Sequence, residues 1–383
     1  MSRNEEPVVA GNPRIKVVGV GGGGGNAINT MVESGFQGAD FVAANTDYKS
    51  LSRSKAATRI QLGTKLTKGL GAGAKPMVGR DAALEDRDEL RQTLQGVDMI
   101  FVAAGMGGGT GTGAAPVVAE VARELGSLTV GVVTKPFTRE GKYRMLQAEA
   151  GISELKKHVD SLIVIPNDRL LGLAKKGVSI LDAFKPSDDV LRQAVQGITD
   201  LITTAGLINA DFADVKAIMG ERGLAMMGIG IASGENRAME AATSAISSPL
   251  LEEIDITGAK GVLVNITGSS SLTMDEFDTV SRVIHDHAHE DANIITGVVI
   301  DEELGEAVKV TVIATGFGDS FDLVNPEKKR SLEVADIRKI NYEIPTFLRE
   351  KSHTRQTRPL SILPNDEDPV YDIPTFMRKK LTE

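Results

Sequence analysis

Ile15-Lys-Val-Val-Gly-Val-Gly-Gly-Gly-Gly-Gly-Asn26 is the stretch of sequence that decides the fold. It begins as a short apolar strand, continues as a glycine run and opens a predicted helix at Asn26. Missing side chains let backbone N–H groups approach an anion, and the N-terminus of a helix adds positive potential. The stretch therefore predicts a phosphate site between a strand and a helix. The open alternative is a tight turn that only packs the strand against the helix.

The same run also satisfies the G-x-G-x-x-G pattern, as Gly19-Val-Gly-Gly-Gly-Gly24. Asp40 and Asp47 follow at about the distance of the acid that binds ribose in dinucleotide-binding folds. A dinucleotide-dependent oxidoreductase is therefore one candidate function, although this motif alone is weakly specific.

Downstream of this stretch, short apolar runs alternate with helical patterns. The runs lack clean alternation, which is typical of strands buried on both faces. They predict strands at Ile15–Val20, Phe41–Ala44, Met99–Ala104, Thr129–Thr134 and Leu162–Ile165. The intervening patterns predict helices at Asn26–Glu33, Asp81–Gln95, Ala114–Leu125 and Lys142–His158. This order predicts an α/β fold that contains a Rossmann-like domain with a parallel sheet.

A second glycine-rich stretch, Gly105-Met-Gly-Gly-Gly-Thr-Gly-Thr-Gly113, also lies between a predicted strand and a predicted helix. Its backbone N–H groups and threonine hydroxyls can bind phosphate oxygens. A dehydrogenase needs only one such loop, so the pair favours a nucleoside triphosphate. Because the chain has no G-x-x-x-x-G-K-[ST] motif, it is not a P-loop NTPase.

The remainder of the chain predicts a long central helix, a smaller α/β domain and a tail. An apolar stripe over about Ser187–Thr204 predicts a helix that runs between two domains. Further strands are predicted near Ala225–Ile231, Val262–Ile266, Ile294–Ile300 and Val308–Ala314, with helices near Glu235–Ile246 and Met274–His287. The expected division is a disordered N-terminus (1–12), a nucleotide-binding domain (13–180), the central helix (181–206), a second domain (207–318) and a flexible tail (319–383).

Composition excludes several classes of protein. The 383 residues include no cysteine, which excludes disulfides, cysteine-ligated metals and thiol catalysis. A net charge of −9 argues against general nucleic-acid binding. No apolar run is long enough to cross a bilayer, so we expect a cytoplasmic protein without direct membrane insertion. Three histidines in His285-Asp-His-Ala-His289 could suggest a metal site, but a solvated helix end is the simpler interpretation, and no metal ligands are predicted.

Gly107-Gly-Gly-Thr-Gly-Thr-Gly113 resembles the signature of the tubulin/FtsZ superfamily, and the chain closely resembles its bacterial cell-division branch, the FtsZ family. The resemblance covers about Arg14 to Gly318. Supporting segments are Gly69–Gly73, Thr134–Phe137, Glu140–Arg144, Ile165–Asp168 and Asn209–Asp214. The resemblance implies a self-polymerising GTPase that binds GTP, releases GDP and uses Mg²⁺.

The resemblance also implies a role for individual residues. Gly22 to Asn26 would line the α- and β-phosphates, Gly71 to Gly73 the γ-phosphate, and Gly109 to Gly111 would wrap the phosphates. Glu140 and Arg144, which their spacing puts on one helix face, would meet the ribose; the alternative is a surface ion pair. Phe184 would stack on guanine while Asn167 and Asp188 bind its edge, with Asp189 left open as the alternative acid. The full implied set is Gly21, Gly22, Gly23, Gly24, Gly25, Asn26, Asn45, Gly71, Ala72, Gly73, Gly107, Gly108, Gly109, Thr110, Gly111, Thr134, Glu140, Arg144, Asn167, Phe184 and Asp188.

Asn209, Asp211 and Asp214 are the implied catalytic residues. By the resemblance, their loop meets the GTP of the next subunit, where the two acids would orient water beside the γ-phosphate. Neither subunit would then have a complete site, so hydrolysis would require polymerisation. From spacing alone, helix capping is the favoured interpretation of Asp211 and Asp214. A relative that assembles but hardly hydrolyses GTP is a further alternative, which these intact acids disfavour.

The tail contains an internal repeat. Tyr342-Glu-Ile-Pro-Thr-Phe-Leu-Arg349 and Tyr371-Asp-Ile-Pro-Thr-Phe-Met-Arg378 differ only at their second and seventh positions. Such short amphipathic segments are typical of peptides that dock in a groove. By resemblance, Tyr371–Arg378 would bind membrane-anchoring and regulatory division proteins at mid-cell, and Tyr342–Arg349 is a candidate second copy.

Overall fold

The computed structural model describes residues 13–171, 180–204, 208, 210–221, 223–251 and 258–317. The predictions for residues 1–12 and for the tail, including both repeat copies, lie outside these residues.

A parallel sheet forms the first half of the described chain. Its strands are β1 (Ile15–Val20), β2 (Asp40–Asn45), β3 (Thr58–Gln61), β4 (Met99–Gly105), β5 (Leu128–Lys135) and β6 (Ser161–Pro166). They lie in the order β3-β2-β1-β4-β5-β6, and every neighbouring pair is parallel. The five predicted strands are confirmed, and β3 was not predicted. All carboxyl ends therefore meet at one edge of the sheet.

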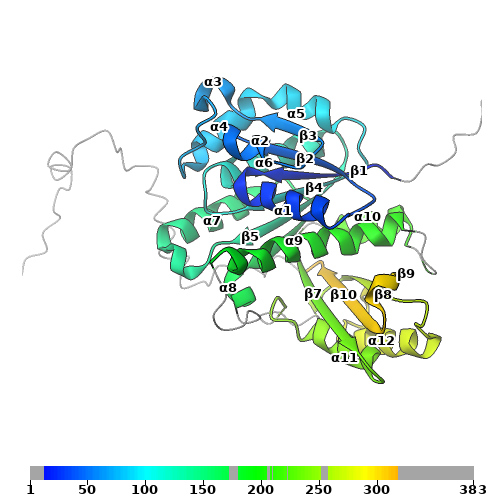
Figure 1. Cartoon of the computed structure of the whole chain (residues 1–383). Coiled ribbons are helices and arrows are strands. Elements are labelled where there is room, and N and C mark those ends of the chain that lie inside the picture. Colours follow the sequence, from blue (N-terminus) through cyan, green and yellow to red (C-terminus); the bar gives the residue numbers. More distant parts are fainter. Residues whose placement is uncertain are drawn as a thin grey trace, which may run out of the picture. The chain divides into compact units, whose positions relative to one another are not determined.

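Helices cover both faces of this sheet (Figure 1). The larger ones are α1 (Gly21–Glu33), α4 (Pro76–Glu85), α5 (Arg87–Leu94), α6 (Thr110–Glu124) and α7 (Lys142–Leu155). Short turns of helix are α2 (Tyr48–Ser52), α3 (Thr64–Thr67), η1 (Thr138–Glu140) and α8 (Asn167–Leu171). The predicted helix ends were wrong in detail: α1 begins at Gly21 rather than Asn26, α6 begins at Thr110 rather than Ala114, and α7 ends at Leu155 rather than His158. The predicted helix Asp81–Gln95 is two helices that meet at Asp86.

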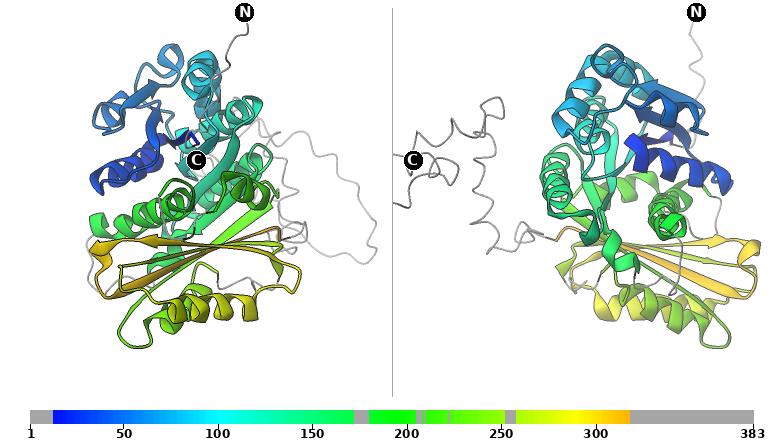
Figure 2. Two further views of the ribbon diagram at one scale, coloured as in Figure 1. Left: turned by 90° about the vertical axis from the view of Figure 1, so that its right-hand side faces the viewer. Right: turned by 60° about the vertical axis from the view of Figure 1, so that its left-hand side comes forward.

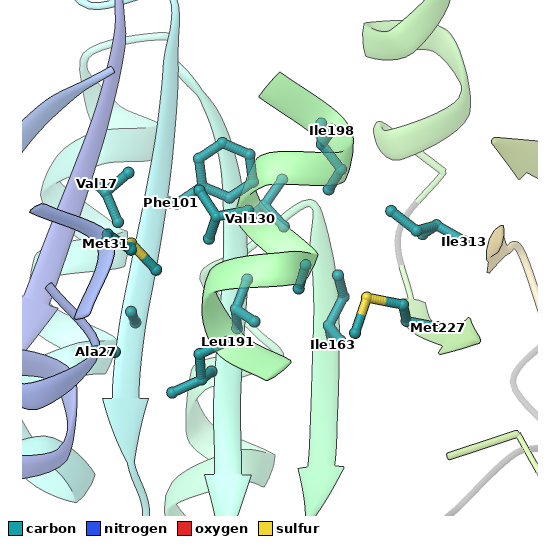
Figure 3. Close-up of a cluster of buried hydrophobic side chains, with 14 of the residues drawn as sticks. Val17, Ala27, Met31, Phe101, Val130, Ile163, Leu191, Ile198, Met227 and Ile313 are labelled. Carbon is teal, nitrogen blue, oxygen red and sulfur yellow. The ribbon is translucent and has the colours of Figure 1, made fainter. Parts of the chain in front are cut away.

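The central helix α9 (Ile180–Thr203) joins the two halves of the molecule. Leu191 and Ile198 on this helix belong to one buried cluster. The cluster also contains Phe101 and Val130 from the parallel sheet and Ile313 from the second sheet (Figure 3). The predicted apolar stripe therefore packs in both directions, which is why this helix is buried between two sheets.

The second half is a smaller α/β unit. Its sheet contains β7 (Gly223–Ser233), β8 (Gly261–Gly268), β9 (Asn293–Ile300) and β10 (Ala307–Thr315), in the order β7-β10-β8-β9. α11 (Arg237–Ile246) and α12 (Met274–His287) lie on the side away from α9 (Figure 2). A short helix, α10 (Phe212–Met219), and a 3-10 turn, η3 (Glu302–Leu304), complete it. The start of β7 pairs with β6 and the rest with β10, so this strand links the two sheets.

Candidate nucleotide site

The glycines of the first run fall into two groups, according to whether a side chain at that position would collide with the rest of the chain. A Cβ on Gly24 would lie 2.3 Å from the carbonyl oxygen of Ala103, and one on Gly19 would lie 2.4 Å from the carbonyl oxygen of Gly24. These two glycines let α1 pack against the sheet. A Cβ on Gly22 or Gly25 would meet nothing within 4 Å. The packing interpretation therefore fits Gly19 and Gly24, whereas Gly22 and Gly25 leave an open face for a ligand.

The two glycine-rich stretches lie against each other. Gly21 starts α1 with a positive φ of 73°, and a Cβ there would lie 2.8 Å from the backbone nitrogen of Gly111. A Cβ on Gly23 would lie 3.1 Å from Cα of Gly105. The structure thus brings both predicted phosphate loops to the carboxyl edge of the sheet, at the N-termini of α1 and α6.

A third loop, at Gly71–Gly73, joins them. A Cβ on Gly109 would lie 2.8 Å from the Cβ of Ala72, so this loop packs directly on the second glycine stretch. The hydroxyls of Thr46 and Thr110 are hydrogen-bonded at 2.6 Å, which ties the end of β2 to the start of α6. The carbonyl of Thr46 in turn accepts from the N–H of Gly71. Three loops therefore form one floor.

Gly107 and Gly108 complete the second stretch in different ways. Gly107 has a positive φ of 95° and donates its N–H to the hydroxyl of Thr112 at 2.8 Å. A Cβ on Gly108 would meet nothing within 4 Å, so this residue leaves an open approach to the floor.

A cleft of about 120 Å³ opens beside this floor. Its lining brings together seven of the predicted residues, which are far apart in the sequence: Gly23, Asn26, Thr134, Glu140, Arg144, Asn167 and Asp188. Thr134 is the penultimate residue of β5, and Asn167 directly follows β6. The cleft therefore collects side chains from successive strand ends, as expected at the carboxyl edge of an open α/β sheet.

Glu140 and Arg144 do form an ion pair, with 3.1 Å between Oε2 and Nη1. The prediction that both lie on one helix face was wrong. Glu140 belongs to η1, α7 begins only at Lys142, and Gly141 between them has a φ of 104°. Gly141 therefore separates η1 from α7, and both side chains line the cleft. Glu140 and Arg144 therefore form an ion pair with each other and also line the cleft.

Asp188 is the acid that faces the cleft. Burial raises the pKa of its carboxyl group to about 7. Asp189 points elsewhere and is held by Arg192, 2.7 Å away, on the same helix. Phe184, the predicted stacking residue, is part of α9, but its side chain lies outside the described part of the chain.

Ser187 was not predicted as a site residue. Its hydroxyl donates a 2.9 Å hydrogen bond to Oδ1 of Asn167, and both side chains are buried. Ser187 also lines the cleft. Its position next to Asp188 near the start of α9 is the one sequence signal that could have found it.

Asp211 and Asp214 lie at the opposite edge of the sheet. Both are exposed, at the start of α10. α10 is tied to the amino end of β6, where the hydroxyl of Ser161 donates a 2.7 Å hydrogen bond to the carbonyl of Met219. Asn167 lies past the other end of β6, a strand about 20 Å long. α8 and α10 accordingly flank opposite ends of α9 (Figure 1).

The capping interpretation of this acidic pair receives little support. Asp211 is the N-cap of α10, yet its side chain accepts no capping hydrogen bond. Asn209, the third predicted catalytic residue, lies outside the described residues.

Neither acid of the dinucleotide alternative is well suited to bind a ribose. Asp47 caps α2 and accepts hydrogen bonds from the N–H and hydroxyl of Ser50. These bonds, with a further one from the N–H of Lys49, hold its pKa below the usual value. Asp40 starts β2 and therefore lies at the amino edge, away from the glycine run. Asp47, just past the carboxyl end of β2, is thus engaged in capping α2, and Asp40 lies at the wrong edge for a ribose beside that run.

Comparison with known proteins agrees with this geometry. Residues 14–175 match the Tubulin/FtsZ family, GTPase domain, and residues 223–318 match the FtsZ family, C-terminal domain. The chain is 52% identical over 380 residues to the cell division protein FtsZ of Buchnera aphidicola subsp. Schizaphis graminum, covering 98% of this chain and 99% of that protein. The chain belongs to the FtsZ family.

Two more FtsZ proteins show how widely this similarity extends. The cell division protein FtsZ of Coxiella burnetii is 50% identical over 374 residues, or 96% of each chain. A solved structure of an empty FtsZ dimer from M. jannaschii superposes with a TM-score of 0.79 at 46% identity, covering 82% of this chain and 91% of that one. The first half of this FtsZ-family chain is thus a tubulin-type GTPase domain, which implies GTP and GDP as its nucleotides.

Two features are absent from the residues that the structure describes. No cluster of three or more histidine, cysteine, aspartate or glutamate residues is arranged there to bind a metal ion. No helix in the same residues is both long and apolar enough to cross a membrane.

Proposed function

We propose that this FtsZ-family chain is a self-polymerising GTPase that forms the cytokinetic ring at the bacterial division site. One observation carries the mechanism: the cleft with Asp188 and the exposed pair Asp211 and Asp214 occupy opposite edges of one sheet. A single subunit cannot bring both to one nucleotide. A head-to-tail neighbour can, because its far edge would then cover the open cleft.

GTP would lie across the floor of three loops. The open positions Gly22 and Gly25 would let backbone N–H groups approach the phosphates, and the N-termini of α1 and α6 would supply positive potential. Gly71–Gly73 would approach the γ-phosphate. The remaining glycines of both stretches, with Asn45, Thr110 and Thr134, complete the proposed contacts.

Guanine would occupy the far side of the cleft. A carboxylate suits its edge because N1–H and the 2-amino group both donate. Asp188 is buried and faces the cleft, so guanine would supply the donors that burial has removed. Asn167 would bind the same edge, Phe184 would stack on the ring, and Glu140 and Arg144 would meet the ribose.

Hydrolysis would take place at the junction between subunits. Asp211 and Asp214 of one subunit, with Asn209, would orient a water molecule in line with the γ-phosphorus of the other subunit's GTP. Mg²⁺ would neutralise phosphate charge. Since no cluster of three or more acids or histidines is formed by the described residues, it would be held mainly by phosphate oxygens and water.

Such a contact joins different surfaces of two identical chains, so it repeats into an open filament. Residues 13–180 would carry the nucleotide, 181–206 the connecting helix, and 207–318 the activating acids. The tail, 319–383, would connect filaments to membrane-anchoring and regulatory partners through Tyr371–Arg378, with Tyr342–Arg349 as a second site. The oxidoreductase alternative is disfavoured by the position of Asp40 and by the hydrogen bonds with which Asp47 caps α2.

The decisive experiment measures GTP turnover per subunit against protein concentration, with sedimentation in parallel. We expect turnover to rise with the sedimented fraction. A rate per subunit that stays constant from dilute to concentrated protein would rule out hydrolysis in trans.

Asp214→Ala separates the two halves of this mechanism. The variant should bind GTP like the parent chain and turn it over at least about a hundredfold more slowly. Asp275→Ala is the matched control, since Asp275 is also an exposed acid in the first turn of a helix, α12. If Asp214→Ala instead lost GTP binding, this loop would belong to the nucleotide site of its own subunit, and hydrolysis in trans would be contradicted.

A further inference from the structure

A second and larger cavity, of about 320 Å³, lies on the other side of the glycine run. It is enclosed by α1, the end of β2 and α2. Gly22 and Asn26 form its border with the nucleotide site. Except for Gly21, Gly22, Gly25, Asn26 and Asn45, none of its lining residues has a role in the proposed function.

The charges around this cavity differ from those of the cleft. The cleft is lined by two acids, Glu140 and Asp188, and one base, Arg144. The larger cavity is lined by one base, Arg53, and by no carboxylate. Arg53 is exposed, and its guanidinium forms no hydrogen bond or ion pair with another described residue. The cavity therefore favours an anion and is unsuited to a metal cation.

Two amide side chains that line this cavity present hydrogen-bond donors to it, whereas the hydroxyl of Ser50 donates to Asp47 instead. Oδ1 of Asn29 accepts from the backbone N–H of Lys55 at 2.7 Å. Oδ1 of Asn45 accepts from the N–H of Asp47 at 3.1 Å, and Asn45 is only 6% exposed. Each amide has thus used its acceptor atom, which leaves its NH₂ group for the cavity that it lines.

A serine adds a third donor. The hydroxyl oxygen of Ser54 accepts from the N–H of Ala56 at 3.3 Å, so its O–H hydrogen is available to the cavity. One guanidinium with two amides and a hydroxyl is a donor set for a tetrahedral oxyanion.

The position of the cavity indicates which oxyanion. The nucleoside-type residues line the cleft on one side of the glycine run, so the terminal phosphate would lie toward the other side. The loops proposed to surround the γ-phosphate, Gly71–Gly73 and Gly109, do not line the cavity. The cavity therefore lies outside the proposed γ-phosphate loops and borders the proposed phosphate contacts at Gly22, Gly25 and Asn26. Asn45, beside Thr46 and its hydrogen bond to Thr110, connects it to the start of α6.

We infer that this cavity receives the inorganic phosphate released from GTP, with Arg53 as its cation and Asn29, Asn45 and Ser54 as donors. The inference rests on the proposed GTPase function. In that reaction a water oxygen bonds to the γ-phosphorus while the bond from this phosphorus to the β–γ bridging oxygen breaks. The products are GDP, hydrogen phosphate and a proton. A retained phosphate would prolong the GDP·phosphate state of the filament before the subunit interface weakens.

The first test does not need hydrolysis. Inorganic phosphate is titrated into the GDP-loaded full-length chain by calorimetry. We expect saturable binding that Arg53→Gln weakens by about tenfold and Arg53→Lys weakens less. Lys49→Gln is the matched control: it removes one positive charge from α2, the helix whose C-cap is Arg53, but Lys49 does not line the cavity, so binding should change by less than about twofold. The inference would be overturned if phosphate did not bind, or if Arg53→Gln and Lys49→Gln weakened phosphate binding equally.

The second test separates the product from the substrate. In a single turnover, cleavage of GTP is followed by acid quench and free phosphate by a fluorescent phosphate-binding protein. Release should lag behind cleavage in the parent chain, and Arg53→Gln should shorten the lag without changing GTP affinity. A loss of GTP affinity would show that Arg53 binds the γ-phosphate instead. A chain that binds phosphate but cleaves no GTP would contradict the proposed function and not this site.

Discussion

The hydroxyl of Ser187 donates a 2.9 Å hydrogen bond to Oδ1 of Asn167, and so fixes the orientation of a buried amide. Ser187 lies near the start of α9 and Asn167 begins α8, so the bond connects two elements that line one cleft. With Oδ1 occupied, the NH₂ group of Asn167 remains as the donor. Guanine presents acceptors at O6 and N7, whereas adenine presents an amino donor in place of O6. The fixed amide therefore favours guanine.

Ser187→Ala tests this orientation. Without the hydroxyl, the amide can rotate and present its oxygen, so we expect GDP affinity to fall about three- to tenfold and the preference for GTP over ATP to narrow. Nucleotide titrations of both bases measure this directly. Ser52→Ala, at an exposed position on α2, is the control. An unchanged preference in Ser187→Ala would show that the amide is oriented by something else.

Asp188 predicts a dependence of nucleotide binding on pH. Burial raises its pKa to about 7, so below this pH the empty cleft holds a neutral carboxyl group, which accepts poorly from guanine. GDP affinity should fall by up to about tenfold for each pH unit below 7, and binding near pH 7 should release a proton. Calorimetry in buffers of different ionisation enthalpy measures both.

Two variants control this prediction, and the pH dependence of the stability of the nucleotide-free protein provides a further check. Asp188→Asn should bind weakly with a flat pH profile, whereas Asp189→Asn should keep the profile of the parent chain. Because the folded pKa lies above the unfolded value, this group destabilises the nucleotide-free protein progressively as pH rises from about 4 to 7. A parent chain whose GDP affinity is the same at pH 6 and pH 8 would contradict the proposed role of Asp188.

Neighbouring glycines in α1 should respond oppositely to alanine. In Gly24→Ala the new methyl group collides with the backbone at Ala103, so the free energy of unfolding should fall by about 1–3 kcal/mol or more. Gly25→Ala meets no atom and gains helix propensity, so its stability should be equal or higher by up to about 1 kcal/mol. Its nucleotide affinity should nevertheless fall, because the methyl group projects from the face proposed for phosphate. Thermal unfolding and GDP titration separate these effects, and parent-like GDP binding by Gly25→Ala would move the phosphates elsewhere.

The same glycines show what the sequence could predict. Apolar runs buried on both faces located β1, β4 and β5 to within one residue at each end, because burial is what selects those residues. Glycine is a poor helix former, so propensity placed the start of α1 at Asn26. The helix nevertheless starts at Gly21, and Gly24 lies inside it because close packing against Ala103 tolerates no side chain there. Such a contact is invisible in a local pattern.

The site was predictable in proportion to the specificity of its motifs. Glycine stretches with strand-to-helix context predicted phosphate loops, and the tubulin-like signature supplied the residues of the cleft. Ser187 was missed because its role depends on a partner on another element. Arg53 was missed because a lone exposed arginine belongs to no motif. It lines a cavity only because α1 and α2, which are far apart in the sequence, lie on two sides of that cavity. β3 was missed because Ile60 is its only buried residue.

Two arginine pairs at α12 should differ sharply in their effect on stability. Arg237 is 10% exposed and binds the carboxylate of Glu276, whereas Arg282 and Asp278 form a pair that is 67% exposed. Arg237→Ala should lower the free energy of unfolding by about 2–4 kcal/mol, and Arg282→Ala by at most about 0.5 kcal/mol.

The hydrogen bond from Arg237 lowers the pKa of Glu276 to about 2, below its unfolded value. The stabilisation is therefore present above about pH 4.5 and lost as pH falls toward 2. Urea unfolding at pH 7 and pH 3 should show the gap between Arg237→Ala and the parent chain narrowing in acid. An equal gap at both pH values would mean that Arg237 stabilises through its bonds to the carbonyls of Ser271 and Glu306 rather than through the ion pair.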